Sequence, residues 1–284
     1  MTTRSGRTAS AHADQRTEPS ESGVRKFTID HDGVRTPVSR GGRGRPLVMC
    51  PGLASTQADL RELLGLLRRD HEVVGFDLRG HGKATAGERY SFEGFLSDLN
   101  AVMAGVSFAE PPVLVGYSLG ADLVVHYASE NPGAFSELVL IDGADPVPEP
   151  FLGEADLPEF RAMFQDPAIQ EAREQTLGTE HQVLLTGADL LDLNIEVDLV
   201  RSRILQRYGM IDQPITMIMS TAMAGTDPDE RTAWRNRNWQ AGIDRLRTEH
   251  PDISATWIEA DHTLVFTHAP QLADIIRQAT ADPR

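Results

Sequence analysis

Residues 116–120 read Gly116-Tyr117-Ser118-Leu119-Gly120, and this stretch decides the fold. A strand-like apolar run precedes it at 112–115, and a helix-like run follows it at 121–128. The glycines permit a very tight turn, because a Cβ atom at either position would collide with neighbouring backbone. A G-x-S-x-G sequence between a strand and a helix is typical of a strained turn that exposes the serine hydroxyl. The stretch therefore predicts a nucleophilic serine at 118.

The segments around this turn alternate between strand-like and helix-like patterns. Strands are predicted at 24–29, 35–39, 47–50, 72–76, 112–115, 136–141, 215–219 and 255–259, and helices at 57–69, 92–106, 121–128, 234–248 and 270–280. Such alternation predicts an α/β fold with a mostly parallel, twisted sheet covered by helices on both faces. We expect residues 24–145 and 211–284 to form this core.

Residues 146–210 interrupt the alternation. They carry no convincing strand but several helix-like pieces, including 158–164 and 197–208, so we expect a helical cap insertion over the carboxyl edge of the sheet. Five apolar side chains of this segment are candidates for an acyl pocket, although core packing would explain them about as well: Phe151, Leu152, Phe160, Met163 and Phe164.

The ends and the composition of the chain bound its location and partners. Residues 1–23 are rich in Ser, Thr, Ala and Arg without an apolar core, which predicts a disordered tail rather than a secretory signal. The net charge of -15, with no Lys/Arg-rich run, argues against nucleic-acid or anionic membrane partners, and no apolar stretch approaches the length of a membrane span. Cys50 is the only cysteine, which favours a reducing compartment such as the cytoplasm.

Four ordered segments together resemble the α/β-hydrolase family. They are Cys50-Pro51-Gly52-Leu53, Asp77-Leu78-Arg79-Gly80-His81-Gly82, the stretch 116–120 and Ala260-Asp261-His262, and the resemblance covers roughly residues 24–282. It implies a Ser–acid–His triad in that chain order, with an oxyanion hole near the strand that precedes the first helix. A serine rather than an aspartate at the turn argues against an epoxide or haloalkane hydrolase.

His262 is the predicted general base. It follows the last predicted strand in a short loop, which should end near the same sheet edge as Ser118. A serine hydroxyl needs a base within hydrogen-bond reach, and the ordinary pKa of an imidazole suits that role. Among the other histidines, His81 is expected to be structural as in the family, His126 to pack or face solvent, and His268 to begin the final helix.

Two positions in the fold compete for the acid of the triad. Most relatives place the acid after the strand predicted at 215–219, where the usual slot falls near Met223 and the carboxylates of Asp227 and Asp229 lie slightly further along. Some relatives carry it after the strand that follows the serine, which here ends at Asp142. We favour Asp142 over Asp227, because it stands at a strand terminus close to the strand that leads to the serine. Either residue would orient the imidazole and stabilise its cation.

The expected reaction follows from these residues. Backbone N–H groups of Leu53 and Leu119 should form the oxyanion hole, since Leu119 opens a helix and its N–H has no intrahelical partner. We expect a cofactor-independent serine hydrolase that cleaves a carboxylic ester, lactone or thioester of a small molecule through an acyl-enzyme. No metal-binding or dinucleotide-binding pattern is present, so no metal or cofactor is expected. The family also includes C–C bond hydrolases, cofactor-free peroxidases, cyclases and non-catalytic small-molecule receptors, which remain alternatives.

Overall fold

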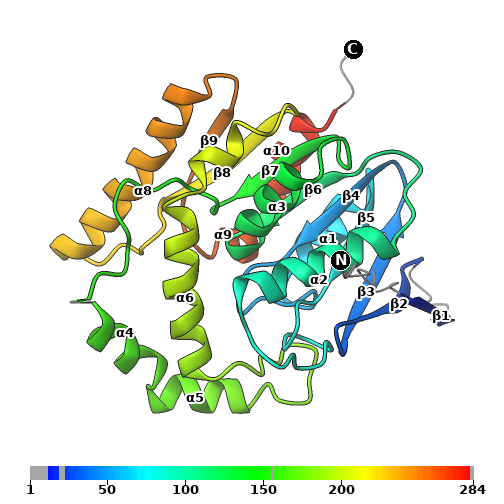
Figure 1. Cartoon of the computed structure of the whole chain (residues 1–284), viewed down its shortest axis with the longest axis horizontal. Coiled ribbons are helices and arrows are strands. Elements are labelled where there is room, and N and C mark those ends of the chain that lie inside the picture. The colour runs from blue at the N-terminus through cyan, green and yellow to red at the C-terminus, as the bar shows by residue number, and fades with distance from the viewer. Residues whose placement is uncertain (1–11, 19–22, 155, 282–284) are drawn as a thin grey trace, which may run out of the picture.

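The computed structural model describes residues 12–18, 23–154 and 156–281. Within these ranges nine strands form one sheet in the order β1-β2-β3-β5-β4-β6-β7-β8-β9 (Figure 1). The strands from β5 onward in this order are parallel, whereas β1, β2, β3 and β5 pair with one another in antiparallel fashion. The strands are β1 His12–Glu18, β2 Arg25–His31, β3 Val34–Gly42, β4 Arg45–Cys50, β5 His71–Phe76, β6 Val113–Tyr117, β7 Glu137–Ile141, β8 Ile215–Ala222 and β9 Ser254–Asp261.

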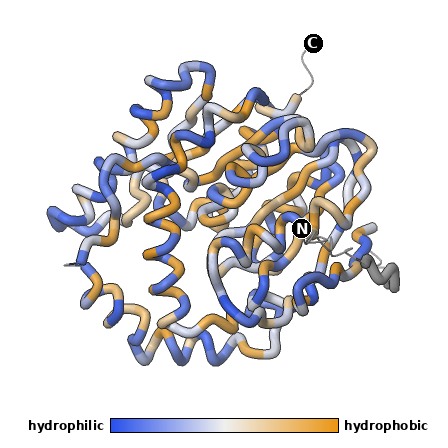
Figure 2. The backbone as a smooth tube through the Cα atoms, viewed as in Figure 1, coloured by the Kyte–Doolittle hydropathy of each residue, from blue (hydrophilic) through white to orange (hydrophobic). Residues whose placement is uncertain are grey.

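Helices cover both faces of this sheet. Side chains of α1 Arg61–Leu67, α9 Leu264–Thr267 and α10 Ala269–Ala279 share one apolar cluster with the sheet, and those of α2 Phe92–Gly105, α3 Leu119–Glu130 and α8 Glu230–Glu249 share the other. Successive residues of β6 alternate between the two, with Val113 and Val115 on the first side and Leu114 on the second. Figure 2 shows the central strands as mainly hydrophobic, as expected for parallel strands that are buried on both faces. The predicted α/β fold is confirmed.

The N-terminal segment differs in part from the expected disordered tail. Residues 1–11 and 19–22 lie outside the described residues, but His12–Glu18 form β1, which pairs with β2. The expectation of disorder therefore does not hold for β1. A physical reason is that pairing satisfies backbone N–H and C=O groups of β1 and β2.

The segment 146–210 contains the helices α4 Leu157–Phe164, α5 Pro167–Glu174, α6 Gly187–Arg201 and α7 Leu205–Tyr208. No strand occurs among its described residues. The helix predicted at 197–208 is divided, because α6 ends at Arg201 and a turn separates it from α7. Neither α4 nor α5 contains a buried residue. In Figure 1 these two helices form an arm that stands away from the sheet and is joined to it through α6. That the segment acts as a cap stays a prediction.

Among the helices of the described ranges, none combines the length and the apolar character needed to cross a bilayer.

Candidate active site

The turn between β6 and α3 holds Ser118 in a strained backbone conformation. Its φ is 52° and its ψ is -123°, a region that residues other than glycine rarely adopt, at a cost on the order of 1–3 kcal/mol. A Cβ atom on Gly116 would lie 2.4 Å from the carbonyl oxygen of Gly120, and one on Gly120 would lie 2.3 Å from that of Cys50. Neither position has room for a Cβ atom, because the neighbouring backbone is too close. This is the collision that the sequence pattern predicts at both glycines.

The imidazole of His262 lies between a hydroxyl and a carboxylate. His262 follows β9, and its Nε2 is 2.8 Å from Oγ of Ser118, while its Nδ1 is 2.8 Å from Oδ2 of Asp142. Because Nδ1–H donates to the carboxylate, Nε2 is left to accept the serine proton. Tyr117 adds a further restraint, since its hydroxyl donates to the backbone carbonyl of His262 over 2.7 Å. The structure thus brings together three residues that are far apart in the sequence.

Asp142 is fully buried, and its carboxylate accepts four hydrogen bonds. Oδ1 accepts from the backbone N–H of Ser220 at 2.9 Å and from Nε1–H of Trp239 at 3.2 Å. Oδ2 accepts from Oγ–H of Ser220 at 2.7 Å as well as from His262. Four donors compensate for the water that a buried carboxylate loses. Burial and orientation together suit this group to hold an imidazole in one tautomer.

Ser220 and Trp239 are site residues that the sequence reasoning missed. Ser220 lies near the end of β8, close to the position at which most relatives are expected to carry the acid. Here its hydroxyl donates to Asp142, which follows the neighbouring strand β7. That placement is the only signal that could have indicated it. Trp239 lies in the middle of α8, and nothing in the sequence around it distinguishes it from a core tryptophan.

The alternative acids lie elsewhere. Asp227 is exposed in the connection between β8 and α8, and within the described residues it makes no hydrogen bond or ion pair. Asp229 is the N-cap of α8, where its carboxylate accepts from the backbone N–H groups of Arg231 and Thr232. The structure brings neither of them to His262, whereas Asp142 contacts it directly.

Leu53 and Leu119 both line the pocket that contains Ser118 and His262. Within the described part of the chain, neither backbone N–H donates a hydrogen bond to another residue. His81 fixes the Leu53 loop, because its Nε2 accepts from the backbone N–H of Ala54 at 3.0 Å and its Nδ1–H donates to the Arg79 carbonyl at 2.9 Å. Burial lowers the pKa of His81, which keeps Nε2 unprotonated as this acceptor role requires.

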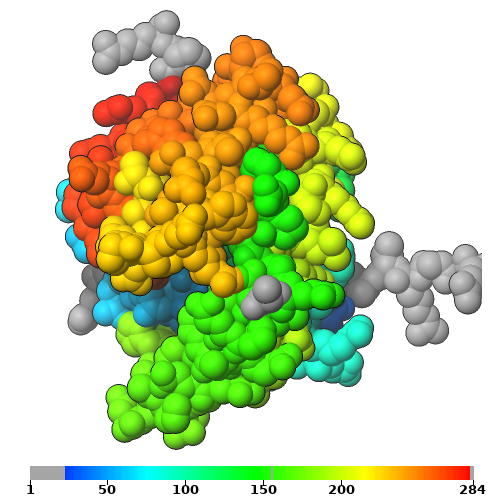
Figure 3. Space-filling view, turned by 90° about the vertical axis from the view of Figure 1, so that its left-hand side faces the viewer, coloured from blue at the N-terminus to red at the C-terminus, as the bar shows by residue number. Residues whose placement is uncertain are grey.

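The pocket beside Ser118 has a volume of about 320 Å³. Phe151, Leu152 and Phe160 line it, as predicted, together with Trp239 of α8. Met163 and Phe164 do not: Met163 is 44% exposed, and Phe164 packs against the core cluster. Figure 3 shows the surface of the segment with α4, in green, beside that of α8, in orange. Residues from both sides of this junction line the pocket.

Three charged side chains also line this pocket: Asp198, Arg201 and Arg235. Arg201 on α6 forms a two-pronged ion pair with the buried Asp122, whose Oδ2 lies 2.7 Å from Nη2. The guanidinium carbon of Arg201 also lies 5.8 Å from the ring centroid of Trp239. The pocket is therefore apolar for most of its wall but carries charged groups at defined places.

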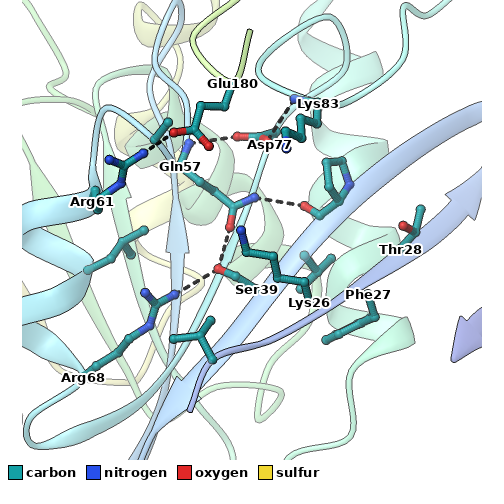
Figure 4. A pocket seen from close by; sticks show the side chains of 15 residues that line it. Lys26, Phe27, Thr28, Ser39, Gln57, Arg61, Arg68, Asp77, Lys83 and Glu180 are labelled. Carbon is teal, nitrogen blue, oxygen red and sulfur yellow. Dashed lines mark hydrogen bonds and ion pairs between the residues drawn. The ribbon is translucent and has the colours of Figure 1, made fainter. Parts of the chain in front are cut away.

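A second cavity, of about 510 Å³, lies between β2, β3 and α1 (Figure 4). Its polar groups bind one another: Gln57 accepts from Oγ of Ser39, and its backbone N–H donates to Asp77. Burial raises the pKa of Asp77 to about 6, despite these hydrogen bonds. The residues that line this cavity include no histidine, so it offers no serine–histidine pair.

The described residues include no group of three or more His, Cys, Asp or Glu side chains arranged to hold a metal ion.

Comparison with known proteins gives one family and several distant relatives. A family profile described as the alpha/beta hydrolase fold matches residues 45–279. A non-heme haloperoxidase from Rhodococcus erythropolis is 32% identical over 125 residues, which are 43% of this chain and 45% of that protein. A 2-hydroxy-6-oxo-6-(2'-aminophenyl)hexa-2,4-dienoic acid hydrolase from Metapseudomonas resinovorans is 25% identical over 141 residues, which are 48% of this chain and 49% of that protein. The chain thus spans less than half the length of these curated relatives.

Among solved structures, the thioesterase domain from the curacin biosynthetic pathway superposes with a TM-score of 0.60. The alignment covers 89% of this chain and 99% of that domain at 18% identity, a level that shows a shared fold.

Proposed function

Because the chain belongs to the α/β-hydrolase fold family, we propose that it is a serine hydrolase that cleaves a carboxylic ester, lactone or thioester of a small molecule through an acyl-enzyme. One observation carries this proposal: the continuous chain of hydrogen bonds from Ser118 through His262 to Asp142. A nucleophile whose proton can pass to an oriented base is the arrangement that acyl transfer requires.

The first half of the proposed reaction forms the acyl-enzyme. Oγ of Ser118 attacks the substrate carbonyl carbon, while Nε2 of His262 accepts the hydroxyl proton. The negative charge that develops on the carbonyl oxygen is stabilised by the free N–H groups of Leu53 and Leu119, and the positive end of α3 adds to this stabilisation. His262 then donates its proton to the departing alcohol or thiol, and the carbonyl re-forms as the leaving group is expelled.

The second half reverses these roles with water. Nε2 of His262 accepts a proton from a water molecule, whose oxygen attacks the acyl carbon bound to Ser118. The same two N–H groups hold the oxyanion, and the return of the proton to Oγ releases the acid. Throughout both halves Asp142 keeps Nδ1 protonated and stabilises the imidazolium, so it needs no proton transfer of its own.

We also propose that residues 146–210 are the cap that shapes the acyl pocket. In support, Phe151, Leu152, Phe160 and Val197 from this segment line the same pocket as Ser118. A cytoplasmic location is part of the proposal, because the single cysteine, Cys50, is buried and burial raises the pKa of its thiol. Such a thiol is unreactive and gives no sign of adaptation to an oxidising compartment.

An active-site fluorophosphonate probe tests the proposal directly. We expect covalent labelling of the folded protein that is abolished in Ser118→Ala but retained in Ser107→Ala, which changes an exposed serine outside the pocket. Labelling should coincide with loss of activity on a panel of 4-nitrophenyl esters of graded acyl length. Folded protein that takes up no probe would favour a non-catalytic, small-molecule-binding role instead.

A further inference from the structure

Of the three charged side chains in the active-site pocket, two have a close hydrogen-bonded partner within the protein. The carboxylate oxygens of Asp198 accept from the backbone N–H groups of Phe151 and Leu152, at 3.1 and 2.8 Å. Arg201 donates from Nε and Nη2 to Asp122. These two side chains are therefore hydrogen-bonded to the protein around the pocket, and the charge of Arg201 is balanced at close range by Asp122.

Arg235 is the exception. Its side chain is 15% exposed, and its Nε and Nη2 are enclosed without a hydrogen-bond partner among the described residues. Nη2 lies 3.8 Å from Oδ1 of Asp156, which is too long for a hydrogen bond, and Asp156 also contacts Arg231. One carboxylate is thus shared between two guanidinium groups. Arg235 is left with unused donors, and its nearest carboxylate is at ion-pair rather than hydrogen-bond distance.

The position of Arg235 places this cation on the wall of the substrate pocket. It lies four residues before Trp239 on α8, so the two side chains share a helix face about one turn apart, about 6 Å along the axis. Trp239 donates to Asp142, whereas the Arg235 guanidinium lies over the ring of Phe160, with its carbon 5.0 Å from the centroid. The cation is therefore displaced from the triad acid toward the segment 146–210.

An enclosed guanidinium without an acceptor is unfavourable. Burial lowers the pKa of Arg235 and the positive charge of Arg231 lowers it further, whereas the carboxylates of Glu159 and Asp229 partly oppose this shift. The face of Phe160 offsets only part of this cost. A carboxylate in the pocket would supply both the missing acceptor and the counter-charge, because its two oxygens match the planar fork of an arginine.

We propose that Arg235 binds a carboxylate group of the substrate, so that the preferred substrates are esters or thioesters that carry a free carboxylate away from the scissile bond. This inference rests on the proposed hydrolase function and names its substrate class. Arg235 binds and positions the substrate, while Ser118, His262 and Asp142 perform the chemistry.

Two matched pairs of esters test the inference. Mono-4-nitrophenyl adipate and 4-nitrophenyl heptanoate differ in the end of the acyl chain, and 4-carboxyphenyl hexanoate and phenyl hexanoate differ in the leaving group. We expect at least one anionic ester to exceed its neutral partner in kcat/KM. Arg235→Gln should lower kcat/KM for that anionic ester roughly 10- to 100-fold, the range for losing a hydrogen-bonded charge, and leave the neutral ester within about twofold.

Two further variants control for charge and for folding. Arg237→Gln removes an exposed arginine of the same helix that does not line the pocket, and it should behave as the parent with all four esters. Arg235→Lys keeps the charge but loses the fork, so it should fall between the parent and Arg235→Gln. Equal losses on anionic and neutral esters in Arg235→Gln, or no anionic preference in the parent, would overturn the inference while leaving the hydrolase proposal intact.

A binding measurement separates the two proposals if no ester is cleaved. Adipate should raise the melting temperature of the parent and of Arg237→Gln, but not that of Arg235→Gln. Such a shift in a protein that neither hydrolyses esters nor takes up a fluorophosphonate would support the carboxylate site and contradict the hydrolase. The absence of an Arg235-dependent shift in that case would contradict both.

Discussion

The loop after β7 contains two buried carboxyl groups in opposite surroundings. Asp142 and Asp145 are both fully buried, yet Asp142 accepts four hydrogen bonds, whereas neither carboxyl oxygen of Asp145 has a partner among the described residues. Burial raises the pKa of Asp145 well above its ordinary value, and Arg201 only partly opposes this. The difference teaches that burial without hydrogen-bond donors raises the pKa of a carboxyl group, whereas the four donors to Asp142 replace the water that its carboxylate loses.

The largest difference between the two carboxyl groups is expected when each is replaced in turn by an amide. Asp142→Asn should lower kcat about 10³- to 10⁴-fold, because an amide in this place no longer holds the required tautomer of His262. Ester hydrolysis under saturating substrate measures the effect.

Two matched variants complete that experiment. Asp145→Asn and Asp227→Asn should each retain kcat within about threefold, since neither carboxyl group hydrogen-bonds to His262 within the described residues and Asp227 is exposed. Equal and small effects at positions 142 and 227 would show that the acid has been misassigned.

The donors to Asp142 offer a sharper test. Ser220→Ala removes the hydroxyl that donates to Oδ2 but keeps the backbone donor to Oδ1, so we expect kcat to fall roughly 10-fold with little change in KM. Ser220→Thr restores a hydroxyl and should recover most of the rate. A KM effect without a kcat effect would indicate that Ser220 acts on substrate binding instead.

A smaller effect is expected at the indole. Trp239→Phe keeps an aromatic ring beside Arg201 but removes the Nε1–H donor, whose distance of 3.2 Å is the longest of the four. We expect kcat to fall about threefold and the free energy of unfolding to fall by about 1 kcal/mol. Steady-state kinetics and chemical denaturation measure the two quantities separately. An unchanged kcat would show that the backbone and hydroxyl of Ser220 suffice.

The smallest effect concerns stability rather than rate. Asp145 has a raised pKa in the folded protein, so its contribution is complete below pH 3.8, its unfolded value, and is lost as the pH rises toward its folded pKa. Asn does not ionise. The melting temperature of Asp145→Asn minus that of the parent should therefore increase between pH 4 and pH 8. A difference for Asp145→Asn that does not change with pH would show that the group is ionised in the folded protein.

The sequence predicts those parts of the site that depend on local geometry. The glycines at 116 and 120 are needed by contacts within a few residues or with the adjoining strand end, so the pentapeptide alone indicates the turn. His262 is placed after the last strand, and the hydrolase motifs follow one another in the expected order along the chain. Together these features indicate the edge of the sheet at which Ser118 and His262 meet.

The remaining features depend on contacts between distant residues. Ser220 and Trp239 reach Asp142 across 78 and 97 residues, so no local pattern marks them. The choice between Asp142 and Asp227 is decided by which strand end lies beside the imidazole. The helix predicted at 158–164 coincides with α4, but α4 and α5 bury no residue, so the sequence does not indicate how these two helices pack.

Because Asp142 directly follows β7, no residue at 223–228 in the connection between β8 and α8 hydrogen-bonds to Ser118, His262 or Asp142, although Met223 and Ala224 line the pocket. Ser220 anchors one end of this connection inside the sheet, and Trp239 lies beyond its other end. The sequence of residues 223–228 can therefore be varied without replacing any residue of the triad. A library with random residues at these positions should yield variants with altered substrate selectivity, because Met223 and Ala224 line the pocket.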